Sequence, residues 1–581
     1  MKNYQDKSKY TNTNVLEKII EVTVKSSMAL ALMAAPSKAI GLSFTPVGTY
    51  ATGVFDDSAA RITAFDPNSE RLFVVNDNIV GIDVLNISNP YAPILDFTID
   101  LSLFGNFGGV NSVAYSNSIF AVAVEDEIII NPGEVLFFDN KGNKLNQITV
   151  GALPDLLTFT PDGTKLLVAN EAEPTGYLNF DIDPEGSVSI IDLSHGIENL
   201  THNVAGFQAF NAQVDELRAE GVRIFGPGAT IFSPGATVAQ DLEPEAIAIS
   251  EDGTTAWVTL QENNAIGILD IETATFTDIV ALGFKDHSLP GNGIDASDKD
   301  GEINIENYPV FGMYQPDEIA SYTVGGKTYL VTANEGDSRF YRGFDEEVEL
   351  RANSLPLDPN AFPDADILRQ EGTIGRLEIT NSLGDTDGDR DFDELYVFGG
   401  RSFSIWDEAG GLVFDSGDDF EQITAKLFPE FFNSNDDDND FDNRSDNKGP
   451  EPEGVAIGMV GNSTLAFIGL ERIGGFMTYD VSNPFEPKFI SYTNNRNFSG
   501  DPEDGTAGDL GPEGLTFISA EDSPNGKALL VLANEVSGTT TIYEINSVPE
   551  PGTIFGLLVF GAAGKLLLKR HNKTTEENSA F

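Results

Sequence analysis

The sequence contains no cysteine, which excludes disulfide bonds, thiolate zinc sites and cysteine nucleophiles. Histidines number four, and none is spaced as in the HExxH zinc motif. Basic residues are also scarce: 34 Lys and Arg face 92 Asp and Glu, and the net charge is −58. Such a surface repels phosphates, so we expect no nucleic acid partner. The excess carboxylates favour either solubility outside the cell or local clusters that bind hard divalent cations.

Common hydrolase signatures are missing as well. The sequence has no G-x-S-x-G nucleophile elbow, and Gly325-Gly326-Lys327-Thr328 lacks the upstream glycine of a phosphate-binding loop. We interpret this tetrapeptide as a hairpin turn.

What the chain does contain is a phrase of three parts that recurs along its length. The first part is a Pro-acid pair that opens a strand, the second an apolar strand closing in Asn or Gln followed by Glu, and the third a strand ending in an acidic turn. Copies of the first part stand at 243–247, 315–319, 451–455 and 511–515, with a weaker copy at 153–156. Copies of the second part end at Glu171, Glu262, Glu335, Glu471 and Glu535.

The recurring residues at the strand ends predict repeated units of four short antiparallel strands. Radial repetition of such sheets limits exposed sheet edges. We predict an all-β fold, a seven- or eight-bladed β-propeller with long inter-blade loops. The units start near residues 61, 111, 151, 242, 315, 392, 451 and 511, which makes eight, although closure of the first on the last would leave seven. Long insertions are expected at 195–240, 283–310, 340–390 and 430–450, and a short helix within 208–220.

The N-terminal segment has the order of a signal peptide. Lys18 and Lys25 precede the apolar run 28–35, and Ser37-Lys38-Ala39 follows with small residues at the positions read for cleavage. Residues 1–39 are therefore predicted to form a signal helix, with an amphipathic first helix as the alternative. The prediction implies that the protein is exported.

The C-terminal segment 548–573 has three parts: the motif Pro549-Glu550-Pro551, an apolar helix up to residue 568, and a basic cluster at 569–573. This order resembles the PEP-CTERM sorting signal of Gram-negative bacteria. The resemblance implies an exosortase-type processing enzyme as a partner, transient insertion in the inner membrane through the tail, and a final place on the outer cell surface or outside the cell. Lys565 shortens the apolar run below the roughly 20 residues that span a bilayer. A processing signal is therefore favoured over a permanent anchor.

Five further segments, at 241–245, 283–287, 334–339, 398–406 and 534–540, together resemble the choice-of-anchor I domain. The likeness covers residues 45–546. It implies an exported propeller similar to YVTN and WD40 propellers, with interchangeable C-terminal anchors.

An acidic loop at 385–394 is the best candidate metal site. Its carboxylates alternate along a tight turn and can converge on one cation: Asp385, Asp387, Asp389, Asp391, Asp393 and Glu394. Oxygen-only ligands favour calcium, which is the expected cofactor, and a solvated acidic turn is the alternative. The loop at 295–303 has part of a calcium-loop pattern but lacks an acid at Ala296, so a loop without calcium is favoured there over a calcium site. The Asp- and Asn-rich run 433–446 is expected to be disordered or solvated rather than a metal site.

The repeated acids suggest a second site. Residues at equivalent blade positions form a ring, and a ring at the mouth of the central channel could bind a ligand or a metal ion. The candidates are Glu245, Asp317, Glu453, Glu513, Glu335, Asp337 and Arg339. We expect Arg339, Arg401, Arg444 and Arg472, or divalent cations, to relieve the repulsion. Alternatively, each acid caps a turn of its own blade.

Two functions remain open. The first is a surface-associated calcium-binding propeller that serves as an interaction or structural module of the cell envelope or extracellular matrix, with a matrix polysaccharide or another surface protein as partner. The alternative is a metal-dependent phosphoesterase, alkaline phosphatase- or phytase-like, which would use the ring carboxylates to hold metals, Arg339 for phosphate and His287 as acid or base. The sequence does not decide whether the protein is an enzyme.

Overall fold

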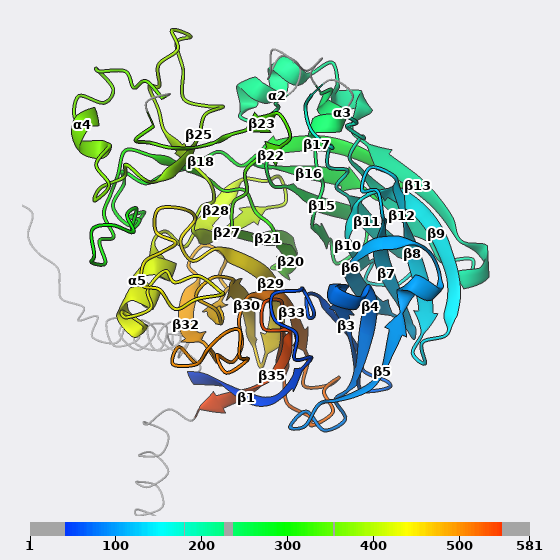
Figure 1. The fold of residues 1–581 in the computed structure, drawn as a ribbon. Helices are drawn as coiled ribbons and strands as arrows, with labels where there is room; N and C mark the ends of the chain where they lie inside the picture. Colours follow the sequence, from blue (N-terminus) through cyan, green and yellow to red (C-terminus); the bar gives the residue numbers. More distant parts are fainter. Residues whose placement is uncertain (1–40, 179–180, 226–235, 353–354, 549–581) are drawn as a thin grey trace, which may run out of the picture. The chain divides into compact units, whose positions relative to one another are not determined.

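The computed structural model describes residues 41–178, 181–225, 236–352 and 355–548, and Phe44–Asn546 form one compact unit (Figure 1). The predicted signal peptide and the sorting motif Pro549-Glu550-Pro551 lie outside the described residues. Among the described residues no helix is both long enough and apolar enough to cross a membrane.

Seven four-stranded antiparallel sheets, the blades, make up most of this unit. In order of the chain they are β2 (Thr63–Asp66), β3 (Arg71–Asn76), β4 (Gly81–Asn86) and β5 (Ile94–Asp100); β6 (Phe107–Ser116), β7 (Ile119–Asp126), β8 (Pro132–Asp139) and β9 (Lys144–Ala152); β10 (Pro154–Phe159), β11 (Lys165–Asn170), β12 (Ser187–Asp192) and β13 (Thr201–Gly206); β14 (Ile247–Ile249), β15 (Thr255–Leu260), β16 (Ala265–Asp270) and β17 (Thr275–Ala281); β20 (Ile319–Val324), β21 (Lys327–Asn334), β27 (Ser402–Asp407) and β28 (Leu412–Asp415); β29 (Pro452–Val460), β30 (Ser463–Leu470), β31 (Phe476–Asp480) and β32 (Lys488–Thr493); and β33 (Pro512–Ile518), β34 (Leu529–Asn534), β35 (Thr539–Val548) and β1 (Gly41–Ala51).

The blades meet in a circle. The first strand of each blade contacts the first strand of the next, from β2 to β6, β10, β14, β20, β29 and β33, and β33 contacts β2 again. These strands surround the centre in Figure 1. No hydrogen-bonded ladder joins one described blade to the next, so side-chain contacts hold the circle together. The arrangement is the predicted β-propeller.

The propeller has seven blades where eight units were counted, and one pairing explains the difference. The units that start near 315 and 392 are one blade, because β21 pairs with β27 across the insertion 335–401. The N-terminal strand β1 pairs with β35, which completes the last blade with a strand from the opposite end of the chain. Seven blades result.

The recurring Asn at the end of the second strand has a structural role. The Asn170 side chain donates to the Ser187 main-chain oxygen at 3.1 Å, and Asn534 donates in the same way to Thr539 at 3.2 Å. Asn334 donates to Ser404 Oγ at 2.8 Å. Each amide joins the second strand to the third, because a buried polar group must find a partner. The acid that follows is thereby placed just beyond the strand, at the end of the blade.

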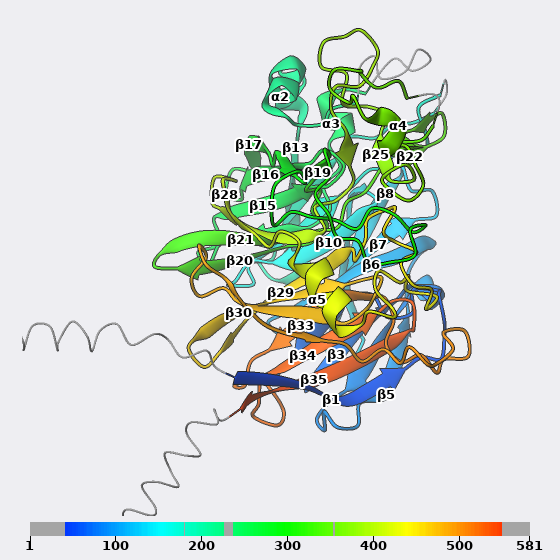
Figure 2. The ribbon, with the colours of Figure 1, turned by 90° about the vertical axis from the view of Figure 1, so that its left-hand side faces the viewer.

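The insertions collect at one end of the blades because connections between second and third strands, and between blades, leave an antiparallel sheet at the same end. In Figure 2 the β20–β21 hairpin extends to the left, whereas β22, β25 and α4 lie to the right. The insertion elements are β18 (Phe284–Asp286), β19 (Phe311–Met313), β22 (Phe340–Tyr341), β23 (Phe344–Asp345), β24 (Glu347–Glu349), β25 (Glu378–Thr380), β26 (Tyr396–Val397), α2 (Val214–Glu220), α3 (Val238–Asp241), α4 (Ala365–Leu368) and α5 (Asp419–Leu427).

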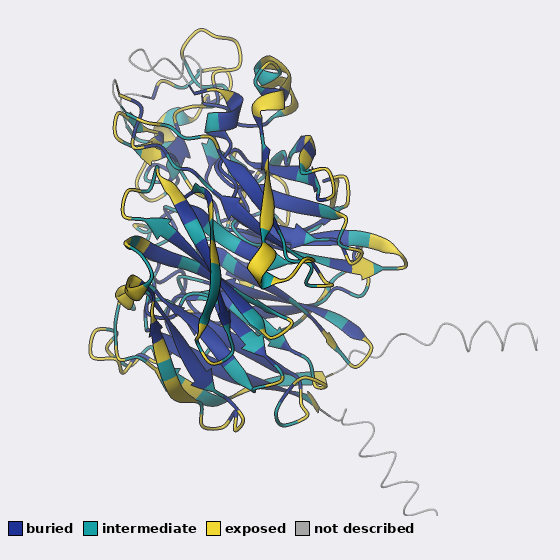
Figure 3. Ribbon diagram, turned by 90° about the vertical axis from the view of Figure 1, so that its right-hand side faces the viewer, coloured by how far each residue is buried: buried dark blue, intermediate teal, exposed yellow. Residues whose placement is uncertain are grey.

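Five of the insertion strands form a small sheet in the order β18, β19, β26, β25, β24, and β22 pairs with β23 separately. The five-stranded sheet packs on a separate apolar cluster that includes Leu350, Leu377 and Val397. The helix expected within 208–220 is present as a single 3-10 turn followed by α2, whose Leu217 is buried. Figure 3 shows that burial is concentrated in the blade strands, while exposed residues gather on hairpin tips and outer strands.

Candidate functional site

Residues from all seven blades line a cavity of about 90 Å³ at the centre of the propeller. Each blade contributes at least one polar side chain from within or just before its first strand: Arg61, Asn111, Asp155, Glu245, Asp317, Glu453 and Glu513. The four acids of the predicted ring are therefore brought together. The Pro-acid pair is the cause, because five of the seven positions are acids that directly follow a proline: Asp155, Glu245, Asp317, Glu453 and Glu513.

The acids at the ends of the second strands join this first set. Carboxylate oxygens of Glu171, Glu245 and Glu262 lie within 4.8 Å of one another, and those of Asp317, Glu335 and Glu453 do the same. Each group combines acids from the first strand and the second strand of neighbouring blades. Both strand ends of the repeated phrase thus bring carboxylates together at the centre.

Burial governs the charge of these groups. It raises the pKa of Glu245 well above its ordinary value, and the nearby Glu262 and Glu171 add to the rise. Burial also raises the pKa of Asp317 and Glu453, with Glu335 adding to both shifts. The pKa of Glu513 rises only to about 8, since the attraction of Arg61 opposes the effect of burial. Burial therefore makes the carboxyl groups of Glu245, Asp317 and Glu453 resist ionisation.

Two basic residues that the sequence reasoning missed lie among these acids. Arg61 Nη2 is 2.8 Å from Glu513 Oε1, and Lys448 Nζ is 2.5 Å from Glu335 Oε1. Arg61 could have been found, because it occupies in the first unit the position that acids occupy in the others. Lys448 could not, because it belongs to the connection between β28 and β29, outside the repeated phrase.

The arginines that were expected to reduce the repulsion among the ring carboxylates differ in the contacts that they make. Arg339 is fully buried and pairs with Glu243 at 3.0 Å, and Arg401 pairs with Glu421 at 2.7 Å, so neither lines the cavity. Arg444 and Arg472 bind Glu451, at 2.5 and 3.0 Å. Arg339 and Arg401 lie outside the cavity because the insertions supply acids that bury these guanidinium groups, although the charge of Arg339 still acts on Glu262.

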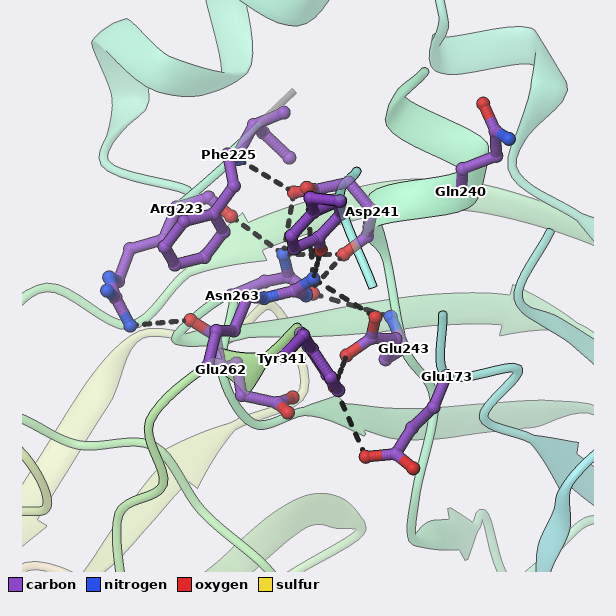
Figure 4. Close-up of polar contacts among 12 residues, drawn as sticks. Glu173, Arg223, Phe225, Gln240, Asp241, Glu243, Glu262, Asn263 and Tyr341 are labelled. Atoms are coloured by element: carbon purple, nitrogen blue, oxygen red, sulfur yellow. Dashed lines mark hydrogen bonds and ion pairs between the residues drawn. The ribbon is translucent and has the colours of Figure 1, made fainter. Parts of the chain in front are cut away.

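Figure 4 shows the polar network beside the channel. Tyr341 Oη lies 3.2 Å from a Glu173 oxygen and 3.3 Å from a Glu243 oxygen, so its one proton is shared between two acceptors. Asp241 accepts from the Phe225 main-chain nitrogen at 2.9 Å and from the Asn263 amide. Arg223 bonds the main-chain oxygen of Glu262, and no contact drawn reaches the Glu262 carboxylate. The network fixes the backbone at Glu262 and leaves its side chain without a partner there.

The remaining predicted ring residue and the histidine lie elsewhere. Asp337 is exposed, does not line the cavity, and accepts the main-chain N–H of Ser338. His287 is buried, with Nδ1 2.7 Å from the Asn292 main-chain oxygen, and burial lowers its pKa to about 3. A buried, neutral imidazole in the insertion between the fourth and fifth blades, outside the cavity, cannot act as acid or base in the channel.

The acidic loop 385–394 is folded around its own carboxylates. Oxygens of Asp385, Asp387 and Asp393 lie within 4.8 Å of one another, and Asp358 forms a second group with Asp391 and Asp393. Asp385 accepts the main-chain N–H of Gly388 at 2.7 Å. Two predicted ligands stand apart from these groups: Asp389 belongs to neither, and Glu394 accepts from Tyr396 Oη at 2.6 Å.

The other two acidic segments are structural. Asp295 is buried and accepts from the Asn304 main-chain nitrogen at 2.6 Å, and Asp298 pairs with Arg376. Within 433–446, Asp442 is buried and accepts from Ser445, so the expectation of disorder was wrong. The insertions use these carboxylates to pair basic side chains and main-chain donors.

Known proteins resemble this chain in sequence and in fold. Residues 61–484 match the choice-of-anchor I domain. The chain is 29% identical over 201 residues to Gigasin-3a of Magallana gigas, which covers 32% of this chain and 69% of that protein. It is 28% identical over 327 residues to the mesenchyme-specific cell surface glycoprotein of Strongylocentrotus purpuratus, covering 50% of this chain and 42% of that protein. The chain thus spans less than half of the second relative.

Among solved structures, the Cps50 (Swd1) β-propeller domain of Myceliophteria thermophila aligns over 86% of this chain and 100% of its own length, with 8% identity and a TM-score of 0.39. The family match and the cell-surface relative suggest a surface-associated β-propeller module. Because the family match covers most of the chain, the protein belongs to the choice-of-anchor I domain family.

Proposed function

We propose that the protein is an exported, calcium-binding β-propeller that serves as an interaction or structural module of the cell envelope or extracellular matrix. The family supports a place at the cell surface, as does a relative named as a cell surface glycoprotein. A net charge of −58 fits an environment in which calcium is plentiful and can neutralise exposed carboxylates.

The convergence of Asp385, Asp387 and Asp393 carries this proposal. Three carboxylates within 4.8 Å in a tight loop offer the hard oxygen ligands that calcium prefers. Gly388, with φ of 85°, lets the chain turn back so that Asp393 accepts from the Thr386 main-chain nitrogen at 2.9 Å. Hydrogen bonds within the loop thus hold these carboxylates close together.

A pocket of about 690 Å³ beside the loop supports the interaction role. Its wall contains Phe225, Phe284, Phe344 and Tyr396, and Asp385 lies on its edge. Concave sites with aromatic walls and a few polar groups are typical of ligand binding. A matrix polysaccharide, or a segment of another surface protein, would contact the aromatic wall and the calcium ion together.

Calcium titration calorimetry on the purified protein tests the loop site. The variant Asp385→Asn/Asp387→Asn should lose one calcium-binding event that the natural protein shows. Asp389→Asn is the matched control, because it removes a carboxylate of the same loop that belongs to neither group. Equal binding by all three proteins would rule out calcium at this loop.

Export and processing form the second half of the proposal. The resemblance of Pro549-Glu550-Pro551 to a sorting motif supports cleavage by an exosortase-type enzyme after transient insertion in the inner membrane. Mass spectrometry of the protein from the envelope fraction should give a C-terminus shortened near residue 549 and an N-terminus near residue 40. A full-length chain in the cytoplasmic fraction would contradict the proposal.

One observation favours the alternative of a metal-dependent phosphoesterase. Arg61 lines the same cavity as the ring carboxylates, so a guanidinium and metal ligands face one space. Arg339 and His287, the groups first considered for this role, are buried outside that cavity. Phosphomonoesters and phytate assayed with calcium decide the matter: turnover abolished by Glu245→Gln would establish the enzyme, and absence of turnover would leave the binding module.

A further inference from the structure

The carboxylates around the propeller centre form three groups, and their surroundings differ in one respect. The groups are Glu171–Glu245–Glu262, Asp317–Glu335–Glu453 and Glu335–Glu451–Glu471, each with oxygens within 4.8 Å of one another. Three carboxylates held this close repel one another unless a positive charge stands among them. The side chains that supply such a charge therefore show which group is already neutralised.

The Glu335–Glu451–Glu471 group has its own cations. Lys448 Nζ lies 2.5 Å from Glu335 Oε1 and 3.1 Å from Glu451 Oε2. Arg472 Nε lies 3.0 Å from the same Glu451 oxygen. Burial alone would raise the pKa of Glu451, but Lys448 and the arginines hold it well below its usual value. The Lys448 ammonium supplies positive charge that a metal ion could otherwise supply. Because Glu335 also belongs to the Asp317–Glu335–Glu453 group, the same lysine reduces the repulsion in that group.

The Glu171–Glu245–Glu262 group lacks a cation paired in this way, although the charge of the buried Arg339, which is paired with Glu243, also acts on Glu262. No ion pair reaches any of its members from a Lys, Arg or His within the described ranges. Glu245 and Glu262 are only 7% and 3% exposed, yet one oxygen of each is buried without a hydrogen-bond partner. An orphaned buried carboxylate oxygen is costly, and two of them on carboxylates that lie this close together indicate a ligand.

The spacing and chemistry identify that ligand as a divalent cation. Calcium binds oxygen at about 2.3–2.6 Å, so ligands across it stand roughly 4.6–5.2 Å apart. The three carboxylates fit within that span. They contain no nitrogen or sulfur ligand, which favours calcium over zinc.

We propose that Glu171, Glu245 and Glu262 bind one calcium ion in the channel, and that the ion neutralises this group as Lys448 neutralises the group that contains Glu335. The ion joins the third blade to the fourth, because Glu171 follows β11 while Glu245 and Glu262 flank β14 and β15. This site is separate from the loop at 385–394, and it can fail or hold independently of the proposed function.

Calorimetric titration of the full chain carrying Asp385→Asn/Asp387→Asn, which removes the loop site, tests the proposal with calcium chloride as the probe. One binding event should remain, and adding Glu245→Gln/Glu262→Gln should weaken it at least 10-fold. Glu318→Gln is the matched control, because Glu318 lines the same cavity but belongs to none of the three groups. Binding that Glu245→Gln/Glu262→Gln leaves unchanged, or that is already absent in the loop variant, overturns the proposal.

Thermal unfolding provides a second test, because it compares the variant with its parent both in a chelator and in calcium. In a chelator, Glu245→Gln/Glu262→Gln should melt at a higher temperature than its parent, because the substitution removes buried repulsion. In calcium the order should reverse, because the parent alone gains the ion. A variant that melts lower than its parent in the chelator, or that gains as much from calcium, contradicts the assignment.

Discussion

Arg61 lies 2.8 Å from Glu513, so the residue that opens the first blade pairs with the residue that opens the seventh. The two are far apart in the sequence and meet where the circle of blades closes. Arg61 also approaches Glu535 at 3.8 Å, at the end of the second strand of the last blade. Closure of the propeller thus has an ionic contact at its centre as well as the pairing of β1 with β35.

Arg61→Met should lower the free energy of unfolding by about 1–3 kcal/mol, because it leaves Glu513 buried without its cation. Urea denaturation measures the change. Arg61→Met/Glu513→Gln should recover most of the loss, since neither charge then remains. A double variant as unstable as the single one would show that packing of the arginine stem, not charge, is responsible.

Lys448→Met should make the protein dependent on calcium for stability. The lysine neutralises Glu335 and Glu451, and without it the channel acids repel one another on both sides. We expect a melting temperature several degrees lower in a chelator and a larger rise on addition of calcium than the natural protein shows. Lys527→Met, which removes a partly exposed lysine paired with Glu544, is the control. An equal calcium response in both variants would contradict the role given to Lys448.

Asp442 should make stability fall as the pH rises. Burial raises the pKa of its carboxyl from 3.8 to about 8. The folded protein therefore holds a proton that the unfolded chain has released, so the stabilisation is complete below about pH 4 and is lost as the pH rises through about 8. Asp442→Asn should reduce the slope of unfolding free energy against pH by at most about 1.4 kcal/mol per unit between pH 5 and 8.

The substitution suits the site, because Asn tolerates the φ of 70° found at Asp442. Urea unfolding at several pH values gives the slope. Asp437→Asn, at an exposed position of the same segment, should leave the slope as it is. A variant with the natural slope would mean that Asp442 is ionised in the folded protein.

Asn334→Ala should cost about 1–3 kcal/mol of stability, because its amide joins the second and third strands of the fifth blade across the long insertion. Urea unfolding of the purified variant measures this. Exposed Asn360→Ala in the insertion, which lacks a link between strands, should have a smaller effect. Similar losses in both would contradict a specific role for the Asn that precedes the channel acid.

The sequence predicted what repeats and missed what does not. Glu245, Asp317, Glu453 and Glu513 could be placed together because the same Pro-acid pair opens each of their blades. Lys448 could not, because its position depends on how one connection folds back over the channel. The fifth blade was divided in two for a related reason: β21 and β27 pair across residues 335–401, and no local pattern connects them.

The two expected cation sites were likewise predicted in part from the sequence and in part missed. Alternation of carboxylates marked the 385–394 loop, yet the structure adds Asp358 from a distant segment and leaves Asp389 outside. The acids at the ends of second strands were recognised as equivalent, but their sorting into neutralised and unneutralised groups depends on Lys448 and Arg472. Spacing along the chain reports which residues share a blade position, and burial and charge decide what each one does.

The last strand of the propeller, β35, lies between β34 and β1 and is held on both sides. A pull on the chain beyond Val548 would load two rows of main-chain hydrogen bonds in shear at once, and strands loaded in shear share the force over all their bonds. The seventh blade is thus built as a mechanical clamp, and a propeller tethered through that end would resist flow or traction without unravelling from its last strand.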